Sequence, residues 1–223
     1  MNTNNALNWS SGQHIYANII KRIIDILVAI VALPFLAVIL IIVSPIIYLS
    51  DRGSVFYTAE RIGRNGKLFR MFKFRSMKMN APDIRLSDGS TYNGSDDPRV
   101  TKIGRFLRST SIDEAPQVLN MLMGDMSLIG PRPDPPDWLD KYPDEIKPFL
   151  LVRPGITGYN QAFFRNLADG EQKMRNDVYY AKHCSLRLDI KIFFQTIAVV
   201  VLHKGMYKDT RNEESALKQA DEV

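Results

Sequence analysis

The stretch SIDEAPQ, residues 111–117, places two neighbouring carboxylates, Asp113 and Glu114, just ahead of Pro116. Ser111 and Glu114 have the spacing of a capping box, and acids favour the positive end of a helix dipole. A carboxylate beside a phosphate can instead contact a bridging divalent metal or attack phosphorus as a nucleophile. The stretch alone favours an ordinary helix start, so any case for chemistry depends on the rest of the chain.

A basic stripe precedes the carboxylate pair. Its four cations recur every three residues with no acid between them, on a predicted short helix: Arg99, Lys102, Arg105 and Arg108. A solvated helical face is the ordinary explanation of such a stripe. Like charges at helical spacing repel one another, however, and this favours a bound anion.

Two further arginines, Arg132 in GPRP and Arg153 in RPG, are held by proline and glycine turns. Arginine binds phosphate oxygens through two parallel hydrogen bonds, and a rigid turn preorganises that contact. The carboxylates, the stripe and these arginines together indicate an enzyme that acts on phosphate or diphosphate esters. A non-enzymatic scaffold that grips anionic lipid is the alternative from another class.

An apolar segment must position this chemistry at a membrane. Residues 26–49 contain no charged side chain. As a helix they would extend ~36 Å, more than the hydrocarbon core of a bilayer. The run is too long and begins too far from the N-terminus for a signal peptide. We therefore predict a membrane segment over residues 15–50.

The charges that flank this segment indicate its topology in the membrane. Lys21 and Arg22 precede it, while residues 52–108 carry thirteen Lys or Arg against five Asp or Glu. Positive charge stays on the cytoplasmic side, and here both flanks are basic. With Pro34 near the middle of the run, this favours a re-entrant hairpin with its apex at Pro34 or Pro45. A spanning helix with a proline kink is the alternative.

Composition narrows the class of protein. Cys184 is the single cysteine, which excludes an internal disulfide and suits a reducing compartment. The three histidines are scattered, without the spacing of a zinc site. The net charge of +5 gathers beside the apolar segment, which favours lipid head groups or an anionic substrate. No nucleic-acid-binding motif is present, so we expect no nucleic-acid partner.

The remaining chain predicts an α+β domain that is mostly helical. Residues 54–78 alternate apolar and basic side chains around Asn65-Gly66, the pattern of a β-hairpin with a two-residue turn. Residues 80–98 form a polar loop, and residues 185–205 an amphipathic helix apolar enough for the membrane interface. We divide the chain into a flexible N-terminus (1–14), a re-entrant membrane helix (15–50), a small cytosolic catalytic domain (51–205) and a charged flexible tail (206–223).

Five motifs carry a resemblance to a known family. They are FKFRSM (72–77), DDPRVTKIGRFLRSTSIDEAPQ (96–117), GDMSLIGPRP (124–133), RPGITG (153–158) and DVYYAKHCSLRLDIKI (177–192). In this order they resemble the bacterial sugar transferase family, the monotopic phosphoglycosyl transferases. The resemblance covers about residues 15–205. The run NQAFFRN (160–166) departs from the usual family pattern and bears on the choice of sugar.

The resemblance implies a reaction and roles for particular residues. A UDP-sugar would give its phospho-sugar to a polyprenyl phosphate such as undecaprenyl phosphate and release UMP. Asp113 would be the nucleophile and would contact Mg²⁺, and Glu114 would be its acid–base partner. The cations implied at substrate phosphates are Lys73, Arg75, Arg108, Arg132 and Arg153.

The same resemblance implies a place in the cell. The protein would lie on the cytoplasmic face of a bacterial inner membrane, in contact with its lipid, with both termini cytoplasmic. It would catalyse the first membrane step of a glycan pathway, and it could form a homodimer. A glycosyltransferase that moves only the sugar and releases UDP is the alternative enzyme.

Overall fold

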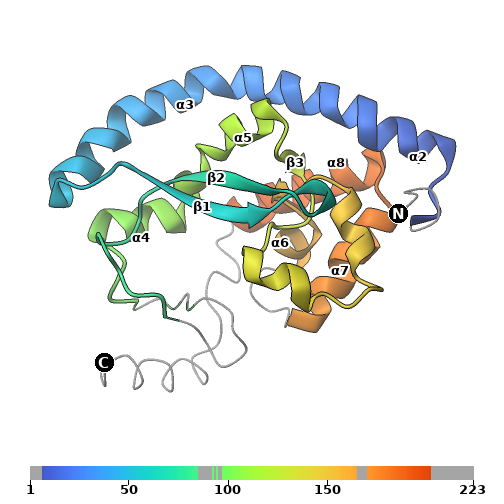
Figure 1. The fold of residues 1–223 in the computed structure, drawn as a ribbon. Coiled ribbons are helices and arrows are strands. Elements are labelled where there is room, and N and C mark those ends of the chain that lie inside the picture. The colour runs from blue at the N-terminus through green and yellow to red at the C-terminus, as the bar shows by residue number, and fades with distance from the viewer. Residues whose placement is uncertain (1–6, 85–91, 93, 95–96, 165–169, 202–223) are drawn as a thin grey trace.

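The protein is described here from a computed structural model, which covers residues 7–84, 92, 94, 97–164 and 170–201. It opens on one unbroken helical stretch made of α2 (Ser11–Ile15), the π-helical turn η1 (Tyr16–Ile20) and α3 (Lys21–Asp51). Figure 1 shows α3 as a shallow arc that lies over the length of the domain below it. Within the described residues, this is the one helix long and apolar enough to cross a membrane.

The structure does not confirm the predicted re-entrant hairpin. α3 continues through Pro34 and Pro45 without reversing. A proline inside a helix removes one hydrogen bond and bends the axis at a cost of about 3 kcal/mol, which a long helix tolerates. Both ends of α3 bind the same domain, through ion pairs of Lys21 with Asp189 and of Asp51 with Arg75. The arc therefore lies along the domain and is fixed to it at both ends.

The two sides of α3 differ in their contacts. The inward side buries Ala29, Leu36, Val43 and Ile47 against the domain. The outward side exposes a continuous row of large apolar side chains, among them Ile23, Leu27, Val31, Phe35, Val38 and Ile42. An exposed apolar face of this size marks a membrane or protein contact.

The predicted β-hairpin is confirmed. β1 (Phe56–Ile62) pairs antiparallel with β2 (Leu68–Phe74), and Ile62 faces Leu68 at the last pair. The connection is five residues long rather than two and contains the 3-10 turn η2 (Arg64–Gly66), with Asn65 and Gly66 both at positive φ. Asn and Gly tolerate that conformation, which is why the turn signal lies there.

Three short helical elements follow the hairpin. They are α4 (Lys102–Ser109), the 3-10 turn η3 (Ile112–Glu114) and α5 (Gln117–Met123), which ends at Gly124 with φ of 97°. Asn120 of α5 fastens this unit to the free edge of β2. Its side-chain amide donates to the Arg70 carbonyl at 2.7 Å, and its oxygen accepts from the Phe72 N–H at 2.9 Å. This contact sets η3 beside β2.

A second, parallel sheet joins two distant segments, β3 (Ser127–Ile129) and β4 (Gly155–Thr157). The 3-10 turns η4 (Pro136–Lys141) and η5 (Lys147–Leu151) lie between them. Gly130 directly follows β3, and a Cβ atom there would come within 2.3 Å of the Arg153 carbonyl oxygen. Glycine at this position therefore lets the GPRP and RPG segments touch.

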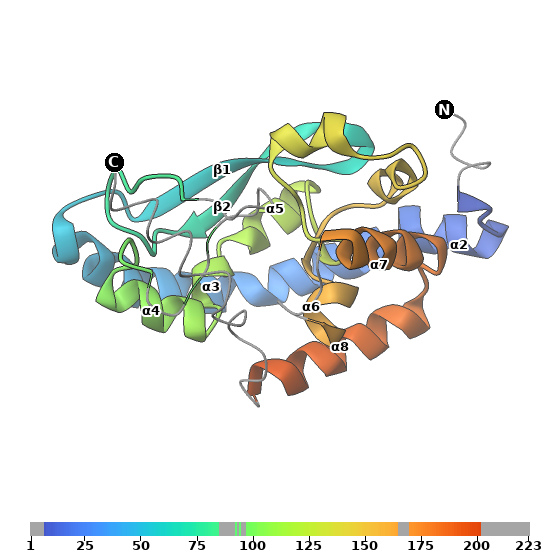
Figure 2. The ribbon, with the colours of Figure 1, turned by 90° about the horizontal axis from the view of Figure 1, so that it is seen from below.

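The chain closes with α6 (Tyr159–Phe163), α7 (Gly170–Lys182) and α8 (Leu186–Val201). Seen from below, these three helices group at the end of the molecule where α2 lies, and α4 lies at the opposite end (Figure 2). The predicted amphipathic helix corresponds to α8, which buries Ile192 and exposes Ile190, Phe194 and Ile197.

Part of the N-terminal segment packs against the domain. Of residues 1–14, expected to be flexible, the structure describes residues 7–14. Leu7 is buried in the core beside α7, and the Trp9 indole N–H donates to the Ala181 carbonyl at 2.8 Å. The predicted tail, residues 206–223, and much of the predicted loop 80–98 lie outside the described residues.

Candidate active site

The carboxylate pair lies on a 3-10 turn, and the capping-box prediction is wrong. Ser111 has φ of 58° and its side chain makes no capping hydrogen bond; only its backbone carbonyl accepts, from the Glu114 N–H at 3.2 Å. A non-glycine residue in the left-handed region stores strain, and such residues gather at functional sites. At three residues per turn, Asp113 and Glu114 point about 120° apart.

Glu114 is held by two cations from distant segments. Its Oε1 accepts from Lys73 Nζ at 2.8 Å and from Arg132 Nη2 at 2.7 Å, and its Oε2 from Arg132 Nη1 at 3.3 Å. Burial opposes ionisation of this carboxyl, but Arg132 and Lys73 outweigh it and hold its pKa well below the usual range. Glu114 is therefore ionised at neutral pH, and a weak base.

Asp113 has the opposite character. It is 8% exposed, and within the described residues its carboxylate accepts no hydrogen bond. Burial raises its pKa, while the charges of Lys73, Arg108 and Arg132 partly compensate. A carboxylate with unoccupied lone pairs, surrounded by cations, can accept a metal ion or attack an electrophile.

Four elements build this group, which we call the Asp113 cluster: Asp113, Glu114, Lys73, Arg108 and Arg132. Lys73 comes from β2, the carboxylates from η3, and Arg132 from the loop after β3. Arg108 comes from the last turn of α4, where its Nε donates to Ser76 Oγ at 3.0 Å. Lys73, Arg108 and Arg132 thus surround the two carboxylates with positive charge.

Two predicted binding residues lie elsewhere. Arg75 contacts Asp51 with both terminal nitrogens and the Ser54 carbonyl with Nε, which ties the end of α3 to β2. Arg153 donates from Nε to the Gly124 carbonyl at 3.2 Å, and the charged groups that act on it are Arg22, Arg64 and Asp25 rather than the carboxylate pair.

The basic stripe also differs from its prediction. Arg99 precedes α4 and is buried in an ion pair with Asp97, Nη2 to Oδ2 at 2.8 Å. Asp97 lies two residues before Arg99, outside the run of residues in which the three-residue repeat was sought. The prediction that Arg99 belongs to a stripe of mutually repelling cations is therefore wrong. Arg108, the last member of the stripe, acts on Asp113.

A second buried ionic group, missed in the sequence, fixes the loop that carries Arg132. We call it the Asp134 network: Asp134, Tyr142, Asn160, Lys173 and Asp177. Lys173 Nζ donates to Asp134 Oδ2 at 2.7 Å and to Asp177 Oδ2 at 3.0 Å. Tyr142 Oη donates to Asp134 Oδ2 at 2.7 Å, and Asn160 Nδ2 to Asp177 Oδ1 at 2.9 Å. Asp177 lies in the motif 177–192 and Asn160 in the run 160–166, and these two positions were the only hint of the network in the sequence analysis.

Burial sets the charge states in this network. It raises the pKa of Asp177 to about 6, although Lys173 opposes the change. Burial would lower the pKa of Lys173, but Asp177 and Asp134 outweigh it and hold the ammonium charged. The network therefore holds a cation firmly between two carboxylates.

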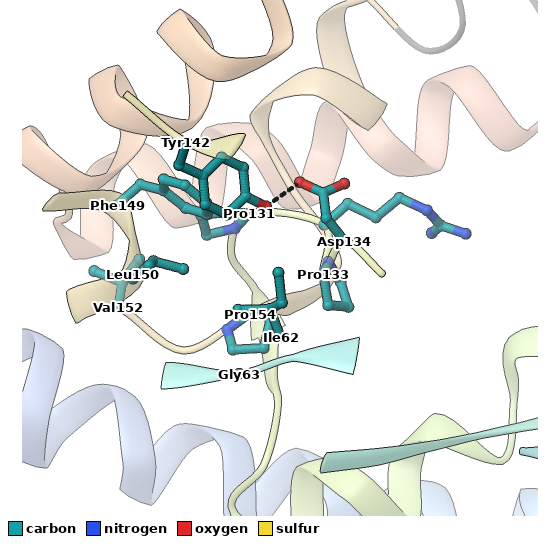
Figure 3. Close-up of a pocket in the computed structure, with 11 residues that line it drawn as sticks. Ile62, Gly63, Pro131, Pro133, Asp134, Tyr142, Phe149, Leu150, Val152 and Pro154 are labelled. Carbon is teal, nitrogen blue, oxygen red and sulfur yellow. Dashed lines mark hydrogen bonds between the residues drawn. The ribbon is translucent and has the colours of Figure 1, made fainter. Parts of the chain in front are cut away.

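An apolar pocket of about 240 Å³, a volume that includes open solvent at its mouth, adjoins the same loop. Figure 3 shows Tyr142 reaching Asp134 beside it, with Phe149 and Val152 on the wall and Pro133 at the loop. Arg132 is one of its lining residues, but the enclosed space is only about 10 Å³, room for about one water molecule.

The described residues contain no group of three or more His, Cys, Asp or Glu side chains that could hold a metal ion by itself. Glu114 is occupied by two cations, which leaves Asp113 as the one carboxylate of the cluster with free oxygens. Magnesium is commonly bound by one or two carboxylates plus substrate phosphates and water. The residues present fit that mode.

Comparison with known proteins is consistent across the chain. The family model described as bacterial sugar transferase matches residues 16–203. The undecaprenyl-phosphate galactose phosphotransferase of Salmonella typhimurium is 40% identical over 205 residues, which cover 84% of this chain and 42% of that protein. A UDP-N-acetylgalactosamine-undecaprenyl-phosphate N-acetylgalactosaminephosphotransferase of Aeromonas hydrophila is 39% identical, over 86% of this chain and 45% of that protein.

A shorter relative is matched over most of its length. The exopolysaccharide production protein ExoY of Sinorhizobium fredii is 39% identical over 84% of this chain and 88% of its own. The chain thus spans less than half the length of the two phosphotransferases and nearly all of this third relative.

Proposed function

The chain belongs to the bacterial sugar transferase family, and from that premise we propose that it transfers a sugar phosphate from a UDP-sugar to polyprenyl phosphate and releases UMP. The observation that carries the proposal is Asp113, a buried carboxylate without a hydrogen-bond partner in the described structure, set among Lys73, Arg108 and Arg132. The names of the relatives support the substrate class, since two of them are undecaprenyl-phosphate sugar phosphotransferases.

In the first step, a carboxylate oxygen of Asp113 attacks the sugar-bearing β-phosphorus of the donor. The new bond joins this oxygen to phosphorus, the bond from phosphorus to the bridging oxygen breaks, and UMP leaves with that electron pair. Arg132 and Lys73 stabilise the charge that develops on the phosphate oxygens. The product is an aspartyl phospho-sugar and free UMP.

In the second step, a phosphate oxygen of the polyprenyl phosphate attacks the same phosphorus, and the Asp113 carboxylate is restored. Two displacements let two anionic substrates use one cationic site in turn, which reduces their mutual repulsion. A phosphate monoester has its second pKa near 6, so the lipid phosphate is mostly a dianion at neutral pH and needs no strong base.

Glu114 then serves to orient Lys73 and Arg132. Its pKa is held low by both cations, so it remains a fixed anion and a poor proton acceptor at neutral pH. The acid–base role that the resemblance implied for Glu114 stays a prediction. A fixed anion between two cations keeps their N–H groups aimed at the site before substrate arrives.

Asp113 would also hold Mg²⁺ through its second oxygen, together with phosphate oxygens of the donor. Bound there, the ion would neutralise part of the diphosphate charge. Asp113 can serve both purposes because neither of its oxygens is occupied by a donor from the described residues.

We place the outward apolar faces of α3 and α8 in one leaflet of the bacterial inner membrane, with the domain and both termini on the cytoplasmic side. The basic flanks of the apolar run support this orientation, since Lys and Arg accumulate on that side. Tags at residue 5 and at the C-terminus should both be protected from external labelling in intact cells. A label that reaches either tag contradicts the placement.

The nucleotide released tests the function directly. We would supply protein in nanodiscs with undecaprenyl phosphate, Mg²⁺ and a panel of UDP-sugars, and separate UMP from UDP by chromatography. UMP formed with one or two donors supports the proposal and names the sugar. UDP would identify a glycosyltransferase that moves only the sugar, and silence across all donors, with wild-type function retained by Asp113→Asn in cells, would favour a scaffold.

A further inference from the structure

One face of the helical run that carries the carboxylate pair is buried. Ala115 and Pro116 have helical backbone angles, so η3 and α5 form a single run from Ile112 to Met123. The buried residues of this run follow helical spacing along one side: Asp113, Pro116, Gln117, Asn120 and Met121. Gln117 therefore lies on the same side as Asp113 and four residues further along, a spacing at which helical neighbours have Cβ atoms about 5–6 Å apart.

Three polar side chains share this buried face, and they differ in their partners. Asn120 donates to the Arg70 carbonyl and accepts from the Phe72 N–H. Gln117 is 1% exposed, and its Nε2 has no acceptor within the described residues. The Asp113 carboxylate accepts no hydrogen bond from them either. One turn of the helix thus holds a buried donor without an acceptor beside a buried acceptor without a donor.

The acceptor for Gln117 must lie within the protein, because its Nε2 is fully enclosed and out of reach of solvent. The side-chain oxygen of Asn120 is occupied by β2, and both oxygens of Glu114 are occupied by cations. Asp113 is the nearby carboxylate of this face with free lone pairs. Buried amide donors are paired in almost all proteins, so an unpaired one at an active site indicates a partner that arrives during the reaction.

We propose that Gln117 is a positioning residue for the second step of the transfer, in which its Nε2 donates to the oxygen of Asp113 that is not bonded to phosphorus. In the aspartyl phospho-sugar, one oxygen of Asp113 is turned toward the substrate, which leaves the other on the buried side of the helix. When polyprenyl phosphate attacks, its oxygen bonds to phosphorus, the bond from phosphorus to Asp113 breaks, and that electron pair returns to the carboxylate. No proton passes between Gln117 and Asp113. This role rests on the proposed function.

A hydrogen bond made at this stage favours the release of Asp113 from phosphorus. The free oxygen of an acyl phosphate is an uncharged carbonyl oxygen, and it regains negative charge as the bond to phosphorus breaks. A donor fixed in a buried site stabilises that developing charge more than it stabilises the intermediate. In the free protein the donor is not engaged, so Asp113 keeps its lone pairs for the first attack. A carboxylate oxygen has two lone pairs, so the hydrogen bond also leaves a position for the proposed Mg²⁺.

The two half-reactions test this role separately in Gln117→Met, which keeps the length of the side chain and removes its amide. With Mg²⁺ and the UDP-sugar identified by the donor panel, but no lipid, UMP release in the first turnover should stay within about threefold of wild type. When undecaprenyl phosphate is then added, transfer from the intermediate should be about 10–100-fold slower, as for the loss of one hydrogen bond to a charged group. Mass spectrometry of the intact protein follows the phospho-sugar adduct, and the unfolding temperature should not fall.

The matched control is Gln172→Met, the same substitution at a glutamine of α7 whose Nε2 donates to Asn176 at 2.9 Å. It should leave both half-reactions unchanged. An equal slowing of transfer in this control, an equal slowing of both half-reactions in Gln117→Met, or no slowing there at all would overturn the role of Gln117 and leave the proposed function intact. A wild-type protein that releases no UMP in the first turnover would instead overturn the proposed function, and this role with it.

Gln117→Glu gives a second measurement, which decides the matter if Gln117→Met fails to fold. An ionised glutamate cannot donate a hydrogen bond, whereas a protonated one can. The rate of transfer from the intermediate, taken relative to wild type, should therefore be low at about pH 8 and rise as the pH falls toward about 5. A ratio that does not change with pH would count against the hydrogen bond.

Discussion

The Asp113 cluster and the Asp134 network are two buried groups of carboxylates and cations on either side of one loop, and they differ in how their hydrogen bonds are used. In the network, Asp134 accepts from Tyr142 and Lys173, and Asp177 accepts on both oxygens. In the cluster, Glu114 is similarly saturated, but Asp113 accepts nothing from the described residues. A saturated network stabilises a fold, while an unsaturated buried carboxylate keeps its capacity for a ligand or a reaction.

The largest effect should come from Asp113→Asn. Turnover should fall by about four orders of magnitude or more, as when a nucleophile is removed from other enzymes. The unfolding temperature should stay the same or rise, because the carboxylate it removes is buried without a donor. UMP release and thermal unfolding measure the two effects, with exposed Asp140→Asn as the control. A strong loss of stability in Asp113→Asn would make the cluster another structural network.

Lys173→Met should reduce stability, in contrast to Asp113→Asn, which should reduce turnover. The change at Lys173 leaves the buried Asp177 and the part-buried Asp134 without their shared cation, so the free energy of unfolding should fall by about 3 kcal/mol. Lys182→Met changes an exposed lysine on the same helix, and should cost far less. Denaturant titration in detergent measures both variants. Equal, small losses would contradict the role assigned to the Asp134 network.

Glu114→Gln separates orientation of the cations from proton transfer. If Glu114 orients Lys73 and Arg132, kcat should fall by about 10²–10³-fold. The KM for the UDP-sugar should stay level or fall, because the site gains positive charge. The shape of the pH–rate profile should not change. Loss of one limb of that profile would instead support the acid–base role.

Asp177 makes the network sensitive to pH. Its pKa in the folded protein, about 6, lies above the value of about 3.9 expected when unfolded, so folding disfavours its ionised form. This cost is fully present above about pH 6 and disappears as the pH falls through about 4. The free energy of unfolding should therefore shift by about 2.4 kcal/mol in favour of wild-type over Asp177→Asn between pH 8 and pH 4. Parallel pH dependences of the two proteins would contradict the raised pKa.

The smallest effect compares two amides on one face of α5. Asn120 makes two hydrogen bonds to β2, so Asn120→Leu should cost about 1–3 kcal/mol. Gln117 is also buried, but its Nε2 has no partner in the structure. Gln117→Leu should therefore be neutral or stabilising by about 1 kcal/mol. Denaturant titration of both variants checks the difference, and a large loss in Gln117→Leu would reveal a partner for that amide.

Local signals in the sequence predicted much of this fold. The alternation around Asn65-Gly66 predicted the hairpin. Motif positions also led to Asp113, Glu114, Lys73, Arg108 and Arg132, which the structure brings together. These signals depend on residues a few positions apart, where backbone geometry fixes which side chains share a face.

Partner choice was less predictable. Arg75, Arg99 and Arg153 looked equivalent to Arg132 as cations beside motif residues. In the structure they bind Asp51, Asp97 and the Gly124 carbonyl. A charge interacts with whatever lies within a few ångströms in space, and sequence spacing carries little of that information across separate elements. For the same reason the sequence did not predict that Lys173 binds both Asp134 and Asp177.

The sequence by itself determined the apolar run, the helices and hairpin, and the residues available for chemistry, because these follow from composition and short-range periodicity. Only the tertiary structure decided that α3 stays a single arc through both prolines, since its two ends are held by Asp189 and Arg75 of one domain. It also decided that Glu114 is saturated by two cations while Asp113 is left open. That difference between neighbouring, chemically similar residues arises from hydrogen-bond geometry across elements distant in the chain.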